Sequence, residues 1–262
     1  MKKWKYTIIA ILIFSFTSWA EASVFKRRDS DGNYIIDKLE GAGLKREALD
    51  LIFNMLDYNA GRIANTQAAV LIDYSKPSTA KRFHLINLWS GEVLSYYVGH
   101  AQSSGFVQTR SFSNRPEERK SSLGFLYARG FRKDPKKDVV IPMDGIDKSN
   151  SQTREKEFVI YGVPFVSEAF AAKNKRMGWS DGGIALGKNE FVELANTLQR
   201  GTLILSYHSD LMALSRKYPK DQSVIGQEIL APGVRKERTP EEINFYKTQS
   251  RSSPSQQHSE VF

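Results

Sequence analysis

The segment 176–182 holds the residues of this sequence that are best suited to chemistry. Ser180 has a glycine two residues before it and two after it, which fits the G-x-S-x-G pattern of a serine hydrolase. That pattern exposes the serine on a sharp turn that follows a strand and precedes a helix. Asp210 and His258 occur in the order of a Ser-Asp-His triad. The residues before the pattern are polar and helix-like, so a hydrolase built on Ser180 is only the alternative interpretation.

The sequence offers few residues for cysteine chemistry, metal binding or phosphate binding. The chain has no cysteine, which excludes disulfides, thiolate metal sites and a cysteine nucleophile. The histidines lie far apart without the H-E-x-x-H spacing of a zinc site, and the segment 144–150 lacks the remaining ligands of a calcium loop. No phosphate-cradling glycine motif follows a strand. We therefore expect no cofactor and no metal.

Residues 158–187 carry a more specific pattern. A strand-like run ends in Tyr161-Gly162, and later comes Arg176-Met-Gly178-Trp-Ser180-Asp-Gly182-Gly183-Ile-Ala-Leu186. This pattern resembles the L,D-transpeptidase catalytic-domain (YkuD-like) family, in particular its murein L,D-transpeptidase branch. That branch has a strand ending in His-Gly, followed by Arg-x-Gly-x-Ser-x-Gly-Cys-Pro-Ala-Leu. Further matching segments lie at 83–88, 98–100, 103–105, 112–114, 121–125 and 202–207.

The resemblance implies a protein of the bacterial cell wall. Members use a histidine-activated cysteine to attack a tetrapeptide stem, and they pass the acyl group to an amine or to water. A neighbouring imidazole is needed because a free thiol is mostly protonated at neutral pH. Here Tyr161 stands in place of the histidine and Gly183 in place of the cysteine. Glycine has no side chain, and a neutral tyrosine is not a base near pH 7. We expect a catalytically inactive member that binds peptidoglycan stem peptides or a cell-wall enzyme.

Several residues keep the family pattern, and they predict a remnant substrate groove in which Arg176 holds a carboxylate through a forked contact. The set is Gly162, Arg176, Gly178, Ser180 and Gly182. The alternative is that these residues only keep a turn folded, with glycines supplying positive φ. His100 and the Ser121-Ser122 pair also match the family, but loop or strand structure explains them. An active peptide hydrolase or transpeptidase that uses Ser180 stays open as the second function.

The remaining chain predicts the elements that position this segment. Apolar residues recur at helical spacing over 44–58, and further helical stretches cover 167–175 and 189–200. Short runs rich in Val, Ile, Leu and Tyr predict strands at 68–74, 82–88, 93–98, 124–128, 139–142, 158–161 and 202–207. The tetrapeptide 89–92 has the length and glycine of a hairpin loop. The predicted class is α+β and strand-dominated: a YkuD-like β-sandwich or mixed sheet with flanking helices.

The first 22 residues have the features of a secretory signal peptide. Three lysines precede an apolar run from Ile8 to Phe16, which is short for a bilayer span, and Ala20-Glu21-Ala22 has the spacing of a cleavage site. We expect export to the periplasm or cell envelope, with no stable membrane insertion once the leader is cleaved. A leader that is kept as an uncleaved anchor is the alternative. The chain carries a net charge of +9, and loss of the three lysines and Glu21 leaves +7. Because the basic residues are scattered among polar and acidic ones, we expect no nucleic-acid partner.

The expected organisation has four parts after the leader. A helical segment spans 23–64, and the L,D-transpeptidase-like domain spans 65–210. A C-terminal extension follows at 211–234. The tail 235–262 is basic, polar and poor in apolar residues, so we expect it to be disordered.

Overall fold

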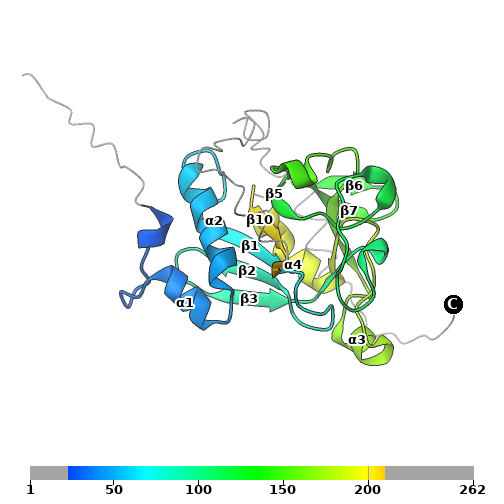
Figure 1. The fold of residues 1–262 in the computed structure, drawn as a ribbon, viewed down its shortest axis with the longest axis horizontal. Helices are drawn as coiled ribbons and strands as arrows, with labels where there is room; N and C mark the ends of the chain where they lie inside the picture. The colour runs from blue at the N-terminus through cyan, green and yellow to red at the C-terminus, as the bar shows by residue number, and fades with distance from the viewer. Residues whose placement is uncertain (1–22, 200, 210–262) are drawn as a thin grey trace, which may run out of the picture.

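A mixed β-sheet forms the centre of the molecule (Figure 1). The computed structural model describes residues 23–199 and 201–209. In this part of the chain the strand order is β3-β2-β1-β10-β5-β7-β8-β9-β4, and β6 pairs with β7 at the side. The strands are β1 (Ala68–Asp73), β2 (Phe83–Asn87), β3 (Val93–Tyr96), β4 (Val98–Gly99), β5 (Gly124–Ala128), β6 (Arg132–Asp134), β7 (Asp138–Gly145), β8 (Val159–Val163), β9 (Ile184–Gly187) and β10 (Leu203–Tyr207).

Strand β7 joins two halves of this sheet. Its residues Met143–Gly145 pair with β5, and its residues Val140–Pro142 pair with β8. Each half holds one parallel pair, β1 with β10 and β8 with β9, while the other pairs are antiparallel. The second half, made of β8, β9 and β4, carries the family-like segment. The fold is therefore strand-dominated α+β, as predicted, and consistent with the YkuD-like fold.

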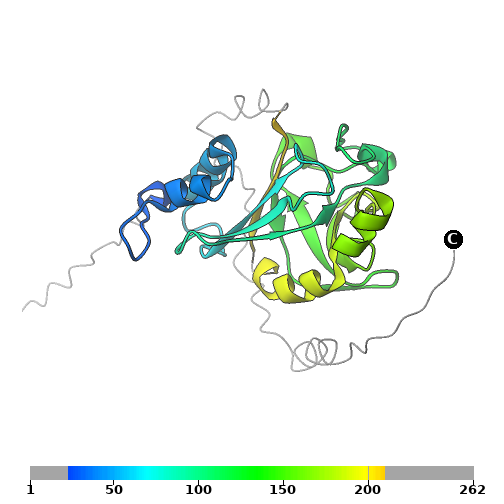
Figure 2. The same cartoon turned by 90° about the horizontal axis from the view of Figure 1, so that it is seen from below.

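Four α-helices flank the sheet in the described ranges. They are α1 (Ile35–Gly41), α2 (Arg46–Tyr58), α3 (Glu168–Asn174) and α4 (Lys188–Leu198), and short 3₁₀ turns occur at Val24–Lys26, Gln102–Ser104, Pro116–Glu118 and Lys148–Asn150. Figures 1 and 2 show α1 and α2 together at one end of the molecule, and α3 at the other. No helix in the described ranges is both long and apolar enough to cross a bilayer.

The strand period of two divides the core between these helices. In β1, Ala69 and Leu71 face a cluster that contains α1 and α2, whereas Val70 and Ile72 face a cluster that contains α4. Strand β10 divides in the same way. Both faces of the central strands are thus covered, and for this reason their sequences read as continuous apolar runs rather than alternating ones.

Most of the predicted helices and strands agree with these elements apart from their ends. The predicted strand at 93–98 is instead two strands, since β3 pairs with β2 and β4 pairs with β9. The predicted helix at 44–58 starts at Arg46, and the predicted loop at 89–92 does join β2 to β3. The predictions missed α1, β6 and β9, which are short and take their stability from pairing or packing on longer elements. The predicted leader, extension and tail at 1–22, 211–234 and 235–262 lie outside the described residues.

Candidate functional site

The family-like residues gather where the C-terminal end of β8 meets the loop that leads into β9. Tyr161 lies in β8 and is buried, and β8 pairs in parallel with β9. The Tyr161 hydroxyl accepts a hydrogen bond from the backbone N–H of Asp181, at 3.1 Å. Lys137 lies over its ring, with Nζ 5.2 Å from the centroid. Burial raises the pKa of the phenol above its usual value, so Tyr161 stays protonated and serves as a hydrogen-bond partner rather than a base.

Gly183 is buried against the neighbouring strand. A Cβ atom built on it would lie 2.4 Å from the carbonyl oxygen of Val159 and 3.2 Å from the Val159 nitrogen. Both are backbone atoms of β8, which cannot turn aside as a flexible side chain does. The position therefore has no room for any side chain, cysteine included, unless the strand and the loop move apart.

Ser180 is a buried structural residue in this geometry. Its hydroxyl donates a hydrogen bond to the Gly183 carbonyl oxygen at 2.6 Å, and its backbone N–H donates to the carbonyl of His100 at 2.8 Å. The G-x-S-x-G segment follows α3 and a loop and precedes β9. This order is the reverse of the strand-then-helix arrangement that exposes a nucleophilic serine.

The glycines of the pattern are needed for packing or for backbone conformation. A Cβ on Gly178 would lie 2.6 Å from the Phe165 carbonyl oxygen, and one on Gly162 would lie 2.9 Å from the Phe191 Cβ. Gly182 has open space around it but a φ of +90°, which side-chain-bearing residues rarely adopt. The two close contacts and the one positive φ angle account for these glycines without giving them a direct part in ligand binding.

Arg176 is the charged residue of the pattern, and its side chain lies among aromatic rings. Its side chain is half-buried, and its guanidinium carbon lies 3.5 Å from the centroid of the Trp179 ring and 5.4 Å from that of Phe106. One guanidinium nitrogen donates to the Met177 carbonyl oxygen at 2.9 Å. No carboxylate of the described residues pairs with Arg176. Phe106 is 60% exposed, so the cluster of Phe106, Trp179 and Arg176 opens to solvent.

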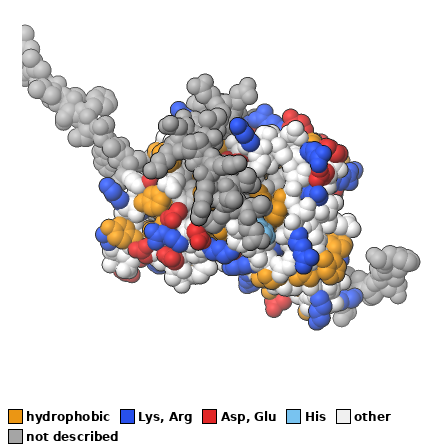
Figure 3. All heavy atoms as spheres, viewed as in Figure 1, with side chains coloured by type: hydrophobic (Ala, Val, Ile, Leu, Met, Phe, Trp, Pro, Cys, Tyr) orange, Lys and Arg blue, Asp and Glu red, His pale blue; other side chains and the backbone are white. Residues whose placement is uncertain are grey.

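Hydrophobic and basic side chains also lie side by side on the surface around this cluster. Figure 3 shows such a mixture at the end of the molecule where α3 lies in Figure 1. Near that end Phe170 of α3 stands 5.8 Å from the Arg176 guanidinium.

Arg82, His100 and the Gly105 carbonyl form a buried chain of hydrogen bonds that reaches the Trp179 indole. Arg82 is fully buried, and it donates to Nδ1 of His100 at 2.7 Å. Because arginine can only donate, His100 must accept at Nδ1 and carry its proton on Nε2, which donates to the Gly105 carbonyl at 3.1 Å. The Trp179 indole N–H donates to the same carbonyl, also at 3.1 Å. Burial, with the charge of Arg82, lowers the pKa of His100 to about 4.

Ser121 and Ser122 are both buried, and only Ser121 bonds next to this chain, at the residue that follows His100. Ser121 accepts a hydrogen bond from the backbone of Ala101 through its hydroxyl, at 3.0 Å, and Ser122 accepts one from the Lys156 ammonium, at 2.7 Å. Burial lowers the pKa of Lys156 to about 8. Sequence reasoning assigned the serines to loop structure and missed Lys156 and Arg82. An arginine at the head of the apolar run 82–88 was the available signal for Arg82.

The described residues hold no group of three or more His, Asp or Glu side chains that is placed to bind a metal ion. The site offers a guanidinium beside aromatic rings. At the two positions that the resemblance gives to catalysis stand Tyr161, whose hydroxyl accepts a backbone hydrogen bond, and Gly183, which has no side chain.

The comparison with protein-family models agrees with the resemblance. Residues 40–207 match the L,D-transpeptidase catalytic domain. No curated protein is detectably similar in sequence to the chain. Among solved structures, an L,D-transpeptidase from Mycobacterium smegmatis has 11% identity and a TM-score of 0.32, covering 53% of this chain and 58% of its own.

A second structure is a fused Zn-dependent amidase/peptidase/peptidoglycan-binding domain-containing protein from Clostridium acetobutylicum. It has 14% identity and a TM-score of 0.32, covering 61% of this chain and 62% of its own. The chain thus spans less than two thirds of either structure. The family match over residues 40–207 covers more than half of the chain. This protein therefore belongs to the L,D-transpeptidase catalytic-domain family.

Proposed function

We propose that this protein is exported to the periplasm or cell envelope and binds peptidoglycan stem peptides through the family's substrate groove without catalysing the family's reaction. The observation that carries the proposal is the environment of Gly183. The resemblance puts this residue at the family's cysteine position, and backbone atoms of β8 fill the space that a side chain there would need. Loss of a nucleophile costs on the order of 10⁶ in turnover.

Binding and catalysis use separable groups, so the loss of the reacting side chains leaves the positioning groups in place. Arg176 offers a guanidinium whose charge is not neutralised by any acid of the described residues. Stem peptides end in carboxylates, which a guanidinium binds through paired hydrogen bonds. The rings of Trp179 and Phe106 hold that guanidinium in one orientation and limit its access to water. This arrangement favours one anionic group of defined position over general attraction to an anionic polymer.

Replacement of Arg176 tests the proposal. We expect Arg176→Ala to weaken binding to purified sacculi about tenfold or more, since a charged hydrogen bond contributes about 1.5–3 kcal/mol. Co-sedimentation over a range of protein concentrations measures the affinity. Lys173→Ala is the matched control, because Lys173 is an exposed cation in the neighbouring helix α3. It should behave like the parent protein.

Salt dependence separates a specific contact from bulk charge. Exposed charges are screened beyond about 8–10 Å at physiological ionic strength. If bulk charge alone binds the wall, moderate salt abolishes sedimentation and the two variants weaken it equally. Such a result would end the groove proposal. Failure of the parent protein to sediment even at low salt would also end it, and would leave a cell-wall enzyme as the partner to seek.

A further inference from the structure

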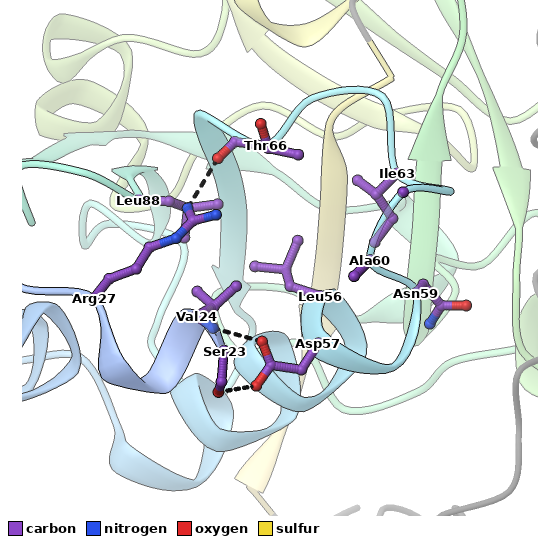
Figure 4. Close-up of a pocket in the computed structure, with 11 residues that line it drawn as sticks. Ser23, Val24, Arg27, Leu56, Asp57, Asn59, Ala60, Ile63, Thr66 and Leu88 are labelled. Carbon is purple, nitrogen blue, oxygen red and sulfur yellow. Dashed lines mark hydrogen bonds between the residues drawn. The ribbon is translucent and has the colours of Figure 1, made fainter. Parts of the chain in front are cut away.

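The first two described residues contact one carboxylate near the end of α2. The Ser23 hydroxyl donates a hydrogen bond to Asp57 Oδ2, and the Val24 backbone N–H donates to Oδ1 at 2.6 Å. Figure 4 shows both contacts at the edge of a pocket of about 200 Å³. Val24 itself is buried in the core cluster that contains α1 and α2. The chain therefore enters the fold at a defined point.

Asp57 lies in an unfavourable place for a carboxylate without a counter-ion. It belongs to the last turn of α2, where the helix dipole disfavours negative charge, and this turn holds no basic residue. No lysine or arginine of the described residues pairs with it. Arg27, the other charged residue of the pocket lining, donates to the Thr66 carbonyl and stacks over Trp89. A cation beside Asp57 would satisfy both the carboxylate and the helix end.

We propose that hydrolysis of the Ala22–Ser23 peptide bond supplies this cation. A leader-cleaving protease adds water across the bond, which leaves a carboxylate on Ala22 and an α-amino group on Ser23 that is protonated at neutral pH. This inference rests on the leader expected from the sequence. The α-nitrogen of Ser23 is three bonds from its hydroxyl oxygen and three from the Val24 nitrogen. Both of these atoms donate to Asp57, and the α-nitrogen lies within about 3.7 Å of each.

The new terminus would then form an ion pair with Asp57. In the uncleaved chain the same nitrogen is an uncharged amide with one hydrogen. After cleavage it is an ammonium with three, and a hydrogen bond from it to the Asp57 carboxylate would be charge-assisted. Cleavage thereby ties the start of the chain to the end of α2. The mature protein is more stable than the same fold with its terminus blocked.

The test uses protein released by a protease that leaves Ser23 as the first residue, compared with the same protein acetylated at that residue. We expect the free-amine protein to melt about 4 °C higher at pH 7. In Asp57→Asn, the two forms should melt alike. Asp50→Asn is the control, since Asp50 lies on α2 but pairs with Arg46, and it should keep the full difference.

The pH dependence has a defined sign. Pairing raises the pKa of the α-ammonium above its unfolded value of about 8, so the stabilisation is present below that pH and is lost as the pH rises through the folded pKa. Arg27 and Asp57 are the charged residues of the pocket lining.

Two results would overturn the inference. One is an exported protein whose first residue, found by N-terminal sequencing, is not Ser23. The other is an acetylation effect that is absent, or equal in the parent and Asp57→Asn. If Asp57→Asn does not fold, the test depends on the parent protein. The inference then requires a difference in melting temperature between the free-amine and acetylated forms, and the loss of that difference at high pH. None of these measurements involves sacculi, so their failure is distinct from failure of the proposed function.

Discussion

The double variant Tyr161→His/Gly183→Cys is expected to be less stable than the parent and to show no transpeptidase turnover, although it restores both residue types of the family. A Cβ at position 183 would lie 2.4 Å from the Val159 carbonyl oxygen, so β8 and the loop must separate. Overpacking of this kind costs about 1–3 kcal/mol. The substitution at 161 also removes the hydroxyl that accepts from the Asp181 N–H.

Chemical unfolding measures the loss of stability, and stem-peptide cleavage measures turnover. Catalytic groups must be held within about 0.5 Å of productive geometry, which a displaced strand does not provide. Gly130→Cys is the matched control, because a Cβ on this exposed glycine would meet nothing within 4 Å. It should keep the parent's stability. A double variant as stable as the parent and active on stem peptides would show that our account of Gly183 is wrong.

The second large effect is a loss of stability between pH 6.5 and about 4. Burial lowers the pKa of His84 and of His100 from 6.5 to about 4. Each histidine is therefore neutral in the folded protein over a range in which the unfolded chain binds a proton. One pKa unit corresponds to about 1.4 kcal/mol, so each histidine accounts for on the order of 2–3 kcal/mol.

The sign follows from the depressed folded pKa values: the stabilisation is complete above pH 6.5 and disappears as the pH falls toward 4. Urea unfolding at pH 7.5, 6, 5 and 4 measures it. Loss from carboxylates begins only near their own, lower pKa values, so the window from 6.5 to 5 reports mainly on the histidines. His100→Gln keeps an acceptor for Arg82 and should remove about half of the slope. A free energy of unfolding that stays flat from pH 6.5 to 4.5 would contradict the burial of two neutral histidines.

The order of the elements could be predicted from the sequence because central strands covered on both faces leave continuous apolar runs. The run 68–74 predicts β1 without indicating which side chains face which layer. That division depends on where α2 and α4 pack, and therefore on contacts between residues far apart in the chain. Short β9 depends on pairing with β8 in the same way, so its sequence alone does not predict it.

The candidate site shows the same limit. The residue types at 161 and 183 predict the absence of the family's chemistry, but the sequence does not show that Val159 closes the space at Gly183. Nor does it show that the Ser180 hydroxyl donates its hydrogen bond to the Gly183 carbonyl oxygen. The support of Trp179 by Arg82 and His100 joins three separate segments, and only the folded chain brings them together.

The central claim is binding of the wall without chemistry, and sacculi incubated with the parent protein test it most directly. After sedimentation at moderate salt, the muropeptides of the pellet are released and compared with those of untreated sacculi. We expect the protein in the pellet and an unchanged muropeptide composition. New cross-links or shortened stem peptides would contradict the claim, and would direct attention to a nucleophile such as Ser180.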